Sequence, residues 1–389
     1  MHLYQDGKQT TIMKRLVFTL CLMCTPLPQT YAAELTTGIQ AGVIYTQDYF
    51  RNIKGGRHEG GAGPGTLDLY ASLDDSTWGG AGDNRFYLDL LGTLGGSISN
   101  QAGDLQTLDN IEAPNTFKVF EAWYQHSFGN SGLMVRVGLQ DYNALFNVLD
   151  AAGILINSSF GHDPTIAQAD PSIFPVTTVG GILRWQSTHG AYVMGAVFDG
   201  VPGLPGHPHG TQIHFLDGEG VFASVEAGIS GSDAKPYKLA AGGWYRTSRF
   251  VDPAGRPREH NHGLYAIAEA RVLHGTGMTI DAFLQLGLAD ADHNKLDHYI
   301  GAGLTAVGLV PLRPDDSVSV GMARAHTSYR YREAVPGSDS AETALEITWR
   351  AALNEHLVVQ PDIQYIINPG AEKALGNAWL LGIRGELSW

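Results

Sequence analysis

The C-terminal segment 377–389 alternates in polarity up to an aromatic last residue, Trp389. One parity carries the large apolar side chains Trp379, Leu381, Ile383, Leu387 and Trp389, and the other carries Ala378, Arg384, Glu386 and Ser388. Successive side chains of a β-strand point to opposite faces, so the segment predicts a strand with one apolar and one polar face. A soluble sheet can show the same stripe, but it rarely repeats it along a whole chain.

The alternation recurs in sixteen segments of about ten residues, the length that crosses a bilayer as a tilted strand. They lie near 38–50, 65–74, 84–95, 117–127, 133–141, 180–186, 191–198, 221–228, 237–245, 263–271, 279–287, 299–307, 317–326, 342–352, 357–367 and 377–389. Beyond residue 32 no run of about eighteen apolar residues occurs, which excludes spanning helices. We therefore expect an all-β chain that forms a transmembrane antiparallel β-barrel of about sixteen strands.

The connections between these segments alternate between short and long. Tight turns are expected at 128–132, 187–190 and 353–356, whereas the long connections 51–64, 96–116, 142–179, 199–220, 246–262, 288–298 and 327–341 are mostly rich in Gly, Pro, Asp and His. An even number of strands places both termini on one side of the barrel and all long loops on the other. This is the arrangement of outer-membrane barrels, with short periplasmic turns and long extracellular loops.

The longest connection, 142–179, contains the apolar stretch 151–156. A loop of this length is usually functional or disordered, and this one is too apolar for disorder. We expect it to fold into the barrel and to narrow a channel as a constriction loop. A surface lid packed on neighbouring loops is the alternative.

The N-terminus predicts export. Met13 is a plausible start, followed by Lys14, Arg15, an apolar run over 16–23 and a small-x-Ala site that ends at Ala32. We expect 1–32 to be a signal peptide and 33–389 a single outer-membrane barrel domain. Both cysteines lie in the signal, so no disulfide or thiol chemistry is expected. Removal of the signal changes the net charge from −14 to −16, which disfavours nucleic-acid binding.

Parity also separates lipid-facing from lumen-facing side chains. The predicted outward set is Leu133, Val135, Val137, Leu139, Leu345, Ile347, Trp349, Ile363 and Tyr365. The inward candidates for the channel are Asp89, Glu121, Trp123, Arg136, Gln140, Arg184, Glu226, Glu346, Arg350, Gln360, Asp362, Gln364 and Arg384. Such mixed charges either contact substrate in a wet lumen or pair across the wall and hold its shape. Trp123 is a candidate for stacking on a sugar ring or for the aromatic girdle, and the girdle is the better interpretation for Trp379 and Trp389.

Several segments together resemble the carbohydrate-selective outer-membrane porins of the OprB family. They are 121–125 (EAWYQ) with 136–138 (RVG), 157–161 (NSSFG), 197–200 (VFDG), 313–316 (RPDD), 342–352 and 360–370 (QPDIQYIINPG). The resemblance covers nearly the whole chain after the signal. It implies a sixteen-stranded barrel that passes glucose and other sugars across the outer membrane by facilitated diffusion.

The resemblance further implies three kinds of partner: small hydrophilic solutes, outer-membrane lipid, and barrel-assembly machinery that recognises the C-terminal strand. It leaves the oligomeric state undecided, with a homotrimer as one possibility. A general or organic-acid-permeable porin is the main alternative. An outer-membrane enzyme is disfavoured because no G-x-S-x-G context occurs, and an adhesin because the inward side chains are polar. We expect no cofactor and no metal. The segment 290–294 lacks the glycine and closing glutamate of a calcium loop, and the proline between His207 and His209 disfavours a tight metal site.

Overall fold

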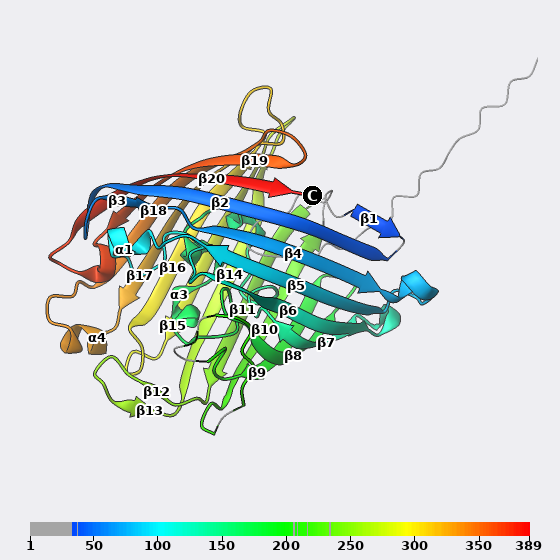
Figure 1. The fold of residues 1–389 in the computed structure, drawn as a ribbon, viewed down its shortest axis with the longest axis horizontal. Coiled ribbons are helices and arrows are strands. Elements are labelled where there is room, and N and C mark those ends of the chain that lie inside the picture. Colours follow the sequence, from blue (N-terminus) through cyan, green and yellow to red (C-terminus); the bar gives the residue numbers. More distant parts are fainter. Residues whose placement is uncertain (1–32, 37, 205–206, 208, 216, 233–234) are drawn as a thin grey trace, which may run out of the picture.

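The chain forms an antiparallel β-barrel in a computed structural model (Figure 1). The structure describes residues 33–389 except 37, 205–206, 208, 216 and 233–234. The predicted signal peptide lies outside the described residues. Within the described part of the chain, no helix is long and apolar enough to cross a membrane.

Sixteen long strands make the wall in the described part of the chain. They are β2 (Ile39–Gly56), β4 (Gly65–Asp74), β5 (Asn84–Leu94), β6 (Thr116–Ser127), β7 (Leu133–Gln140), β8 (Thr178–Gln186), β9 (Ala191–Asp199), β10 (Val221–Ser232), β11 (Lys235–Arg246), β14 (Asn261–His274), β15 (Thr279–Ala289), β16 (Leu296–Val307), β17 (Ser317–Thr327), β18 (Ala341–Ala352), β19 (Leu357–Ile367) and β20 (Gly376–Ser388). Consecutive long strands pair antiparallel, and β20 pairs with β2 to close the sheet. The predicted fold is confirmed.

The remaining elements are short. The strands β1 (Ala33–Thr36) and β3 (Gly60–Ala62) pair with β2, and β12 (Phe250–Val251) pairs with β13 (Pro257–Arg258). The helices are η1 (Asp75–Trp78), α1 (Ser99–Ala102), η2 (Gly129–Ser131), η3 (Asp150–Ala152), α2 (Ser158–Gly161), α3 (Pro164–Ala167), α4 (Tyr329–Ala334) and η4 (Pro369–Ala371).

Long connections and short turns lie at opposite ends of the barrel, as predicted (Figure 1). We call these the loop end and the turn end. The C-terminus lies at the turn end, where the backbone of Trp389 exchanges two hydrogen bonds with that of Val43. The pairing of β20 runs from Ile44 opposite Ser388 to Gly56 opposite Gly376. The closing partner therefore extends beyond the predicted segment 38–50, because β2 is longer than the alternation alone indicated.

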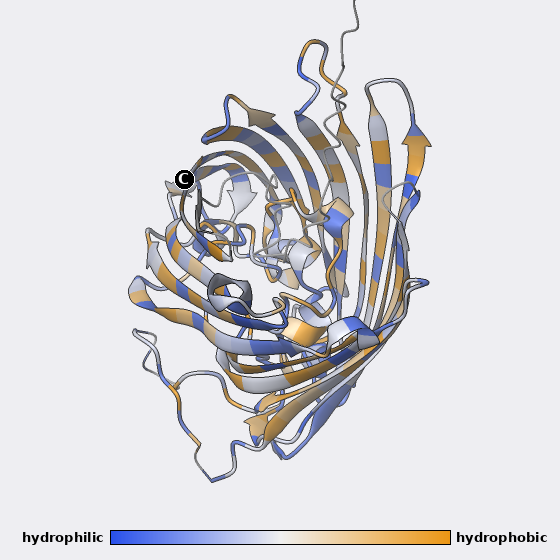
Figure 2. Ribbon diagram, turned by 90° about the vertical axis from the view of Figure 1, so that its right-hand side faces the viewer, coloured by the Kyte–Doolittle hydropathy of each residue, from blue (hydrophilic) through white to orange (hydrophobic). Residues whose placement is uncertain are grey.

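The two faces of the wall follow the alternation of the sequence (Figure 2). On β20, Trp379, Leu381 and Ile383 are exposed on the outer face, whereas Arg384 and Glu386 are buried inside. An outer face of this kind is the apolar band that lipid covers. Several strands depart from strict alternation, and β7 and β6 are two of them. Leu139 on β7 is buried, contrary to its predicted outward position, and a bulge in β6 places both Phe120 and Glu121 inside.

The core of the molecule lies inside the barrel. Figure 2 shows that parts of the chain lie inside the barrel. Two inner segments, 95–115 and 141–177, start at the loop end and contribute their buried residues to this interior core. Tyr142 and Phe146 stack at 4.8 Å between ring centroids, and Phe198 and Phe222 approach Tyr142 edge-on. These rings are at most 1 % exposed, so burial of apolar surface fixes segment 141–177 against the inner wall.

Candidate channel constriction

Carboxylates of the inner wall hold the main chain of segment 141–177. Glu346 on β18 accepts hydrogen bonds from the backbone N–H groups of Ile156 at 2.5 Å and Asn157 at 2.9 Å. Glu226 on β10 accepts from the N–H of Asn147 at 2.9 Å and from the hydroxyls of Tyr192 and Tyr265. A carboxylate that receives two or three donors is a strong anchor in a low-dielectric interior.

The same pattern continues along the segment. Glu121 on β6 accepts from the N–H of Asp141, and Glu269 on β14 accepts from the N–H of Ala151, both at 2.8 Å. Gln360 donates to the carbonyl oxygen of Ile154 at 2.7 Å. Wall side chains that the sequence predicted as channel residues therefore bind the inner segment.

Segment 95–115 is fixed in a similar way from β18 and β19. Glu342 accepts hydrogen bonds from the N–H groups of Leu105 at 2.8 Å and Gly370 at 2.7 Å. Gln364 donates to the carbonyl oxygen of Leu108 and accepts from the side chain of Asn157. The N–H of Asn110 donates to the carbonyl of Ile156, so the two inner segments are bonded to each other as well.

An arginine joins segment 95–115 to the closure of the barrel. The Arg384 guanidinium contacts Asp48 on β2 at 2.6 Å, Asn110 at 2.7 Å and Asp109 at 3.4 Å. Beside it, Arg350 pairs with Glu386 at 2.9 Å. The ion pairs of Arg384 with Asp48 and of Arg350 with Glu386 join strands of the wall, which is the shape-holding role weighed for them from the sequence.

A passage remains between the inner segments and the wall made by β2 and β4. Its volume is about 400 Å³, and it extends from Lys295 and Leu296 near the loop end to Ile44 and Glu386 near the turn end. Its polar lining is mixed in sign and includes Thr46, Thr66, Asp68, Tyr70, Gln106, Asn110, Asp141, Lys295, Arg384 and Glu386. The buried His162 also lines it, and burial lowers the pKa of its imidazole to about 3, so this ring is neutral at physiological pH.

Of the thirteen inward candidates for the channel, Arg384 lines this passage. The other twelve are not part of its lining; they are Asp89, Glu121, Trp123, Arg136, Gln140, Arg184, Glu226, Glu346, Arg350, Gln360, Asp362 and Gln364. Sequence reasoning missed Asp68 and Tyr70, although the alternation of β4 places both inward. Lys295 lies in a connection, where parity gives no signal.

Trp123 packs within the wall of β5, β6 and β7. Tyr87 stacks on its ring at 4.9 Å, and the Arg136 guanidinium lies 4.0 Å from the ring centroid. Trp123 is 4 % exposed and faces inward, so the structure contradicts the girdle position. A sugar could reach the indole face only by displacing one of these neighbours.

Three further candidates for the channel lie on the inner side of the wall, namely Asp89 on β5, Arg184 on β8 and Asp362 on β19. Asp89 is fully buried beside Glu121, and its two carboxylate oxygens have no hydrogen-bond partner among the described residues. Arg184 donates to Gln186 at 3.0 Å. Asp362 accepts from Gln364 at 3.2 Å.

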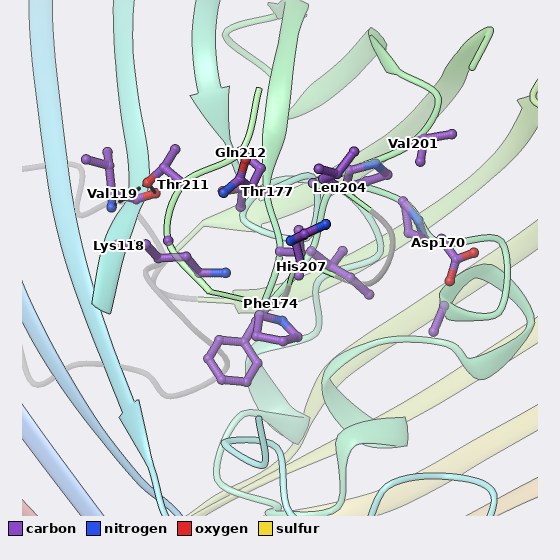
Figure 3. A pocket seen from close by; sticks show the side chains of 18 of the residues that line it. Lys118, Val119, Asp170, Phe174, Thr177, Val201, Leu204, His207, Thr211 and Gln212 are labelled. Atoms are coloured by element: carbon purple, nitrogen blue, oxygen red, sulfur yellow. Dashed lines mark hydrogen bonds between the residues drawn. The ribbon is translucent and has the colours of Figure 1, made fainter. Parts of the chain in front are cut away.

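A second cavity of about 630 Å³ lies beside β6, between Phe174 and the connection that follows β9 (Figure 3). Residues 116–121 of β6 have no partner on β7, and Thr211 from that connection bonds both backbone groups of Val119 instead. The Lys118 side chain extends into the cavity and has no hydrogen-bond or ion-pair partner among the described residues (Figure 3). The cavity thus presents a cationic group near the loop end.

Comparison with known proteins agrees with this architecture. The profile of a family described as "Carbohydrate-selective porin, OprB family" matches residues 58–388. Porin B of Pseudomonas aeruginosa is 25% identical over 188 residues, which cover 40% of this chain and 41% of Porin B, so the match spans less than half of that relative. A high-pH structure of Pseudomonas putida OprB superimposes with a TM-score of 0.81 and 19% identity over 92% of this chain and 95% of that chain. The outer-membrane channel DcaP of Acinetobacter baumannii has a TM-score of 0.57 at 8% identity over 92% of this chain and all of that chain, and both structures establish the fold alone.

Proposed function

This chain belongs to the OprB family of carbohydrate-selective porins, and we propose that it passes glucose and similar small sugars through the outer membrane by facilitated diffusion. The observation that carries the proposal is the narrow, mixed-charge passage between β2, β4 and the inner segments. Family and fold are those of channels, and small solutes are the cargo of such proteins.

The lining suits a solute rich in hydroxyl groups. Asp68 and Glu386 supply acceptors, Arg384 and Lys295 supply donors, and Tyr70 supplies an aromatic ring with a hydroxyl group. Each contact exchanges a water of the sugar for a protein group, and conduction requires that no contact be tight. The charges of both signs that line the passage would orient the dipole of a sugar as it moves.

We extend the proposal to biogenesis. Residues 1–32 would direct export as a signal peptide, and barrel-assembly machinery would recognise the C-terminal strand β20. The exposed position of Trp389 at the turn end supports that recognition. A homotrimer is the oligomeric state we propose to test by native electrophoresis.

Liposome swelling with purified protein tests the proposed sugar transport. Glucose, a disaccharide, and an amino acid matched to glucose in size are compared under equal osmotic gradients. We expect glucose to enter faster than the matched amino acid and the disaccharide to enter slowest. Equal entry of glucose and the matched amino acid would contradict sugar selectivity and indicate a general porin. Absence of swelling with every solute would contradict the proposal that the protein is a porin.

An organic-acid-permeable porin is the second candidate, and the unpaired Lys118 at the loop end favours it. A gluconate arm in the same assay separates the two, because gluconate and glucose differ mainly in charge. Faster entry of gluconate than glucose, abolished by Lys118→Met, would support the acid channel.

A further inference from the structure

A cluster of two histidines and one aspartate lies on the outer side of the barrel at its loop end. His298 on β16 and His326 on β17 stand directly opposite each other in the strand ladder. The Nδ1 atom of His326 lies 2.6 Å from Oδ1 of Asp297, and Nδ1 of His298 lies 2.9 Å from the same oxygen. The two imidazole rings are 5.5 Å apart and nearly perpendicular. No part of this cluster contributes to the passage described above.

We propose that Asp297, His298 and His326 form a binding site for a transition-metal cation of the Zn²⁺ type. One ligand atom from each residue lies within 4.8 Å of the other two. Ligands bound tetrahedrally to Zn²⁺ at about 2.0 to 2.1 Å are about 3.3 Å apart, so small rotations of the side chains suffice to enclose an ion. Two imidazoles and one carboxylate also leave coordination positions open for water.

The surroundings of the cluster support a built site. Both histidines stand on paired strands, whose backbone positions the hydrogen-bonded ladder fixes. Asp297 is 6 % exposed at a register irregularity of β16, which turns its carboxylate toward the two rings. His298 has a side-chain exposure of 62 %, so an ion reaches the cluster from outside the barrel.

The ligand set also decides the class of ion. Imidazole nitrogen is a preferred ligand of Zn²⁺, Cu²⁺ and Ni²⁺, whereas Mg²⁺ and Ca²⁺ prefer sites made of oxygen. No short sequence motif predicts this cluster, because its two histidines come from different strands. The segments around 207–214 and 290–294, which do carry motif-like spacing, contribute nothing to it.

Zn²⁺ binding to the full, untagged protein in detergent tests the proposal. Metal-free protein competes with a chromogenic chelator, and Co²⁺ replaces Zn²⁺ to give a visible absorption band that reports coordination. We expect the wild type to bind one more Zn²⁺ per chain than the double variant His298→Ala, His326→Ala. Asp297→Asn, which keeps the side-chain shape, should weaken binding at least tenfold and reduce the Co²⁺ band.

Matched controls are His189→Ala and His274→Ala, which remove exposed histidines at the turn end and should leave Zn²⁺ binding unchanged. Heat-modifiable migration on gels shows that each variant is folded. Equal Zn²⁺ stoichiometry and affinity in wild type and double variant would overturn the proposal, and so would a wild type that binds no Zn²⁺. Sugar permeation plays no part in this readout, so its outcome is independent of the proposed function.

Discussion

Glu346 holds two consecutive N–H groups of the inner segment with one carboxylate, and this makes it the most informative single residue of the wall. Replacing it by Gln exchanges an acceptor oxygen for an amide group that donates toward those N–H groups. We expect Glu346→Gln to cost about 1–3 kcal/mol of folding free energy and to increase the fluctuations of single-channel current. Planar-bilayer recording and thermal unfolding measure the two effects.

The control for this variant is Glu355→Gln, a change at an exposed carboxylate on a short turn. It should alter neither the current noise nor the unfolding temperature. If the Glu346→Gln variant showed wild-type current fluctuations and wild-type stability, this carboxylate would have no anchoring role.

Asp252, in the connection between β11 and β14, makes the stability of this connection depend on pH. Burial opposes its ionisation, but hydrogen bonds from Arg256 and Arg258 outweigh this effect and lower its pKa to about 2. A carboxyl whose folded-state pKa lies below its usual 3.8 stabilises the fold above that pH and loses the effect as pH falls through about 2. We therefore expect pepsin to leave this connection intact at pH 4 and to cleave it at pH 2. Asp252→Asn should be cleaved at both values, and equal resistance of the wild type at both would contradict the prediction.

Sequence alternation predicted which side of the wall most charged residues occupy, because a strand has a local period of two. It did not predict what those residues bind. Trp123 was a candidate for sugar stacking, yet Tyr87 and Arg136 cover it, and these neighbours come from other strands. It stays a prediction that inward residues contact substrate. The best candidates are now Arg384 and Asp68, which line the passage, although the sequence analysis did not name Asp68.

At the scale of elements, β20 exposes an apolar face from Trp379 to Ile383. Ile383 lies in the interior of this strand, is 49 % exposed and faces outward. We expect Ile383→Arg to destabilise the barrel by about 2–4 kcal/mol in a bilayer, because a charge near the midplane must be dehydrated. Urea unfolding in lipid vesicles measures the loss. Leu353→Arg, on an exposed turn, should cost about 0–1 kcal/mol, and equal losses in the two variants would contradict the lipid-facing assignment.

The strands themselves were predicted within a few residues, whereas register was not. The bulge at Phe120 and the shifted pairing of β2 with β20 depend on contacts between distant residues. At the closure, Phe50 packs so closely on Gly382 that a Cβ there would lie 2.1 Å from the ring. A single-sequence pattern contains no information on such a pair.

At the scale of the whole molecule, we expect the interior segments to set the width of the proposed channel. Removing residues 150–170 would take out η3, α2 and α3, which fill much of the lumen. A barrel of sixteen strands is wider than its wall side chains can fill. We expect the deletion to raise single-channel conductance several-fold and to abolish discrimination between glucose and the disaccharide in swelling assays.

Deleting residues 253–256, in the connection that carries β12 and β13, is the matched control because this loop lies outside the passage. Its conductance should equal that of the wild type. Unchanged conductance after removal of 150–170 would show that this segment is not the constriction.

The anchors of the inner segment have a consequence for how such a channel changes over evolutionary time. Glu121, Glu226, Glu269 and Glu346 bind peptide N–H groups, which every amino acid except proline possesses. Side chains of the segment that line the passage, outside its buried apolar core, can therefore be exchanged without losing the bonds that hold its path. The barrel wall holds the main chain of the inner segment whatever most of its side chains are. New solute preferences can therefore arise by substitutions in this one segment while the wall stays the same. Engineers could use the same tolerance, provided that proline is kept from the anchored positions.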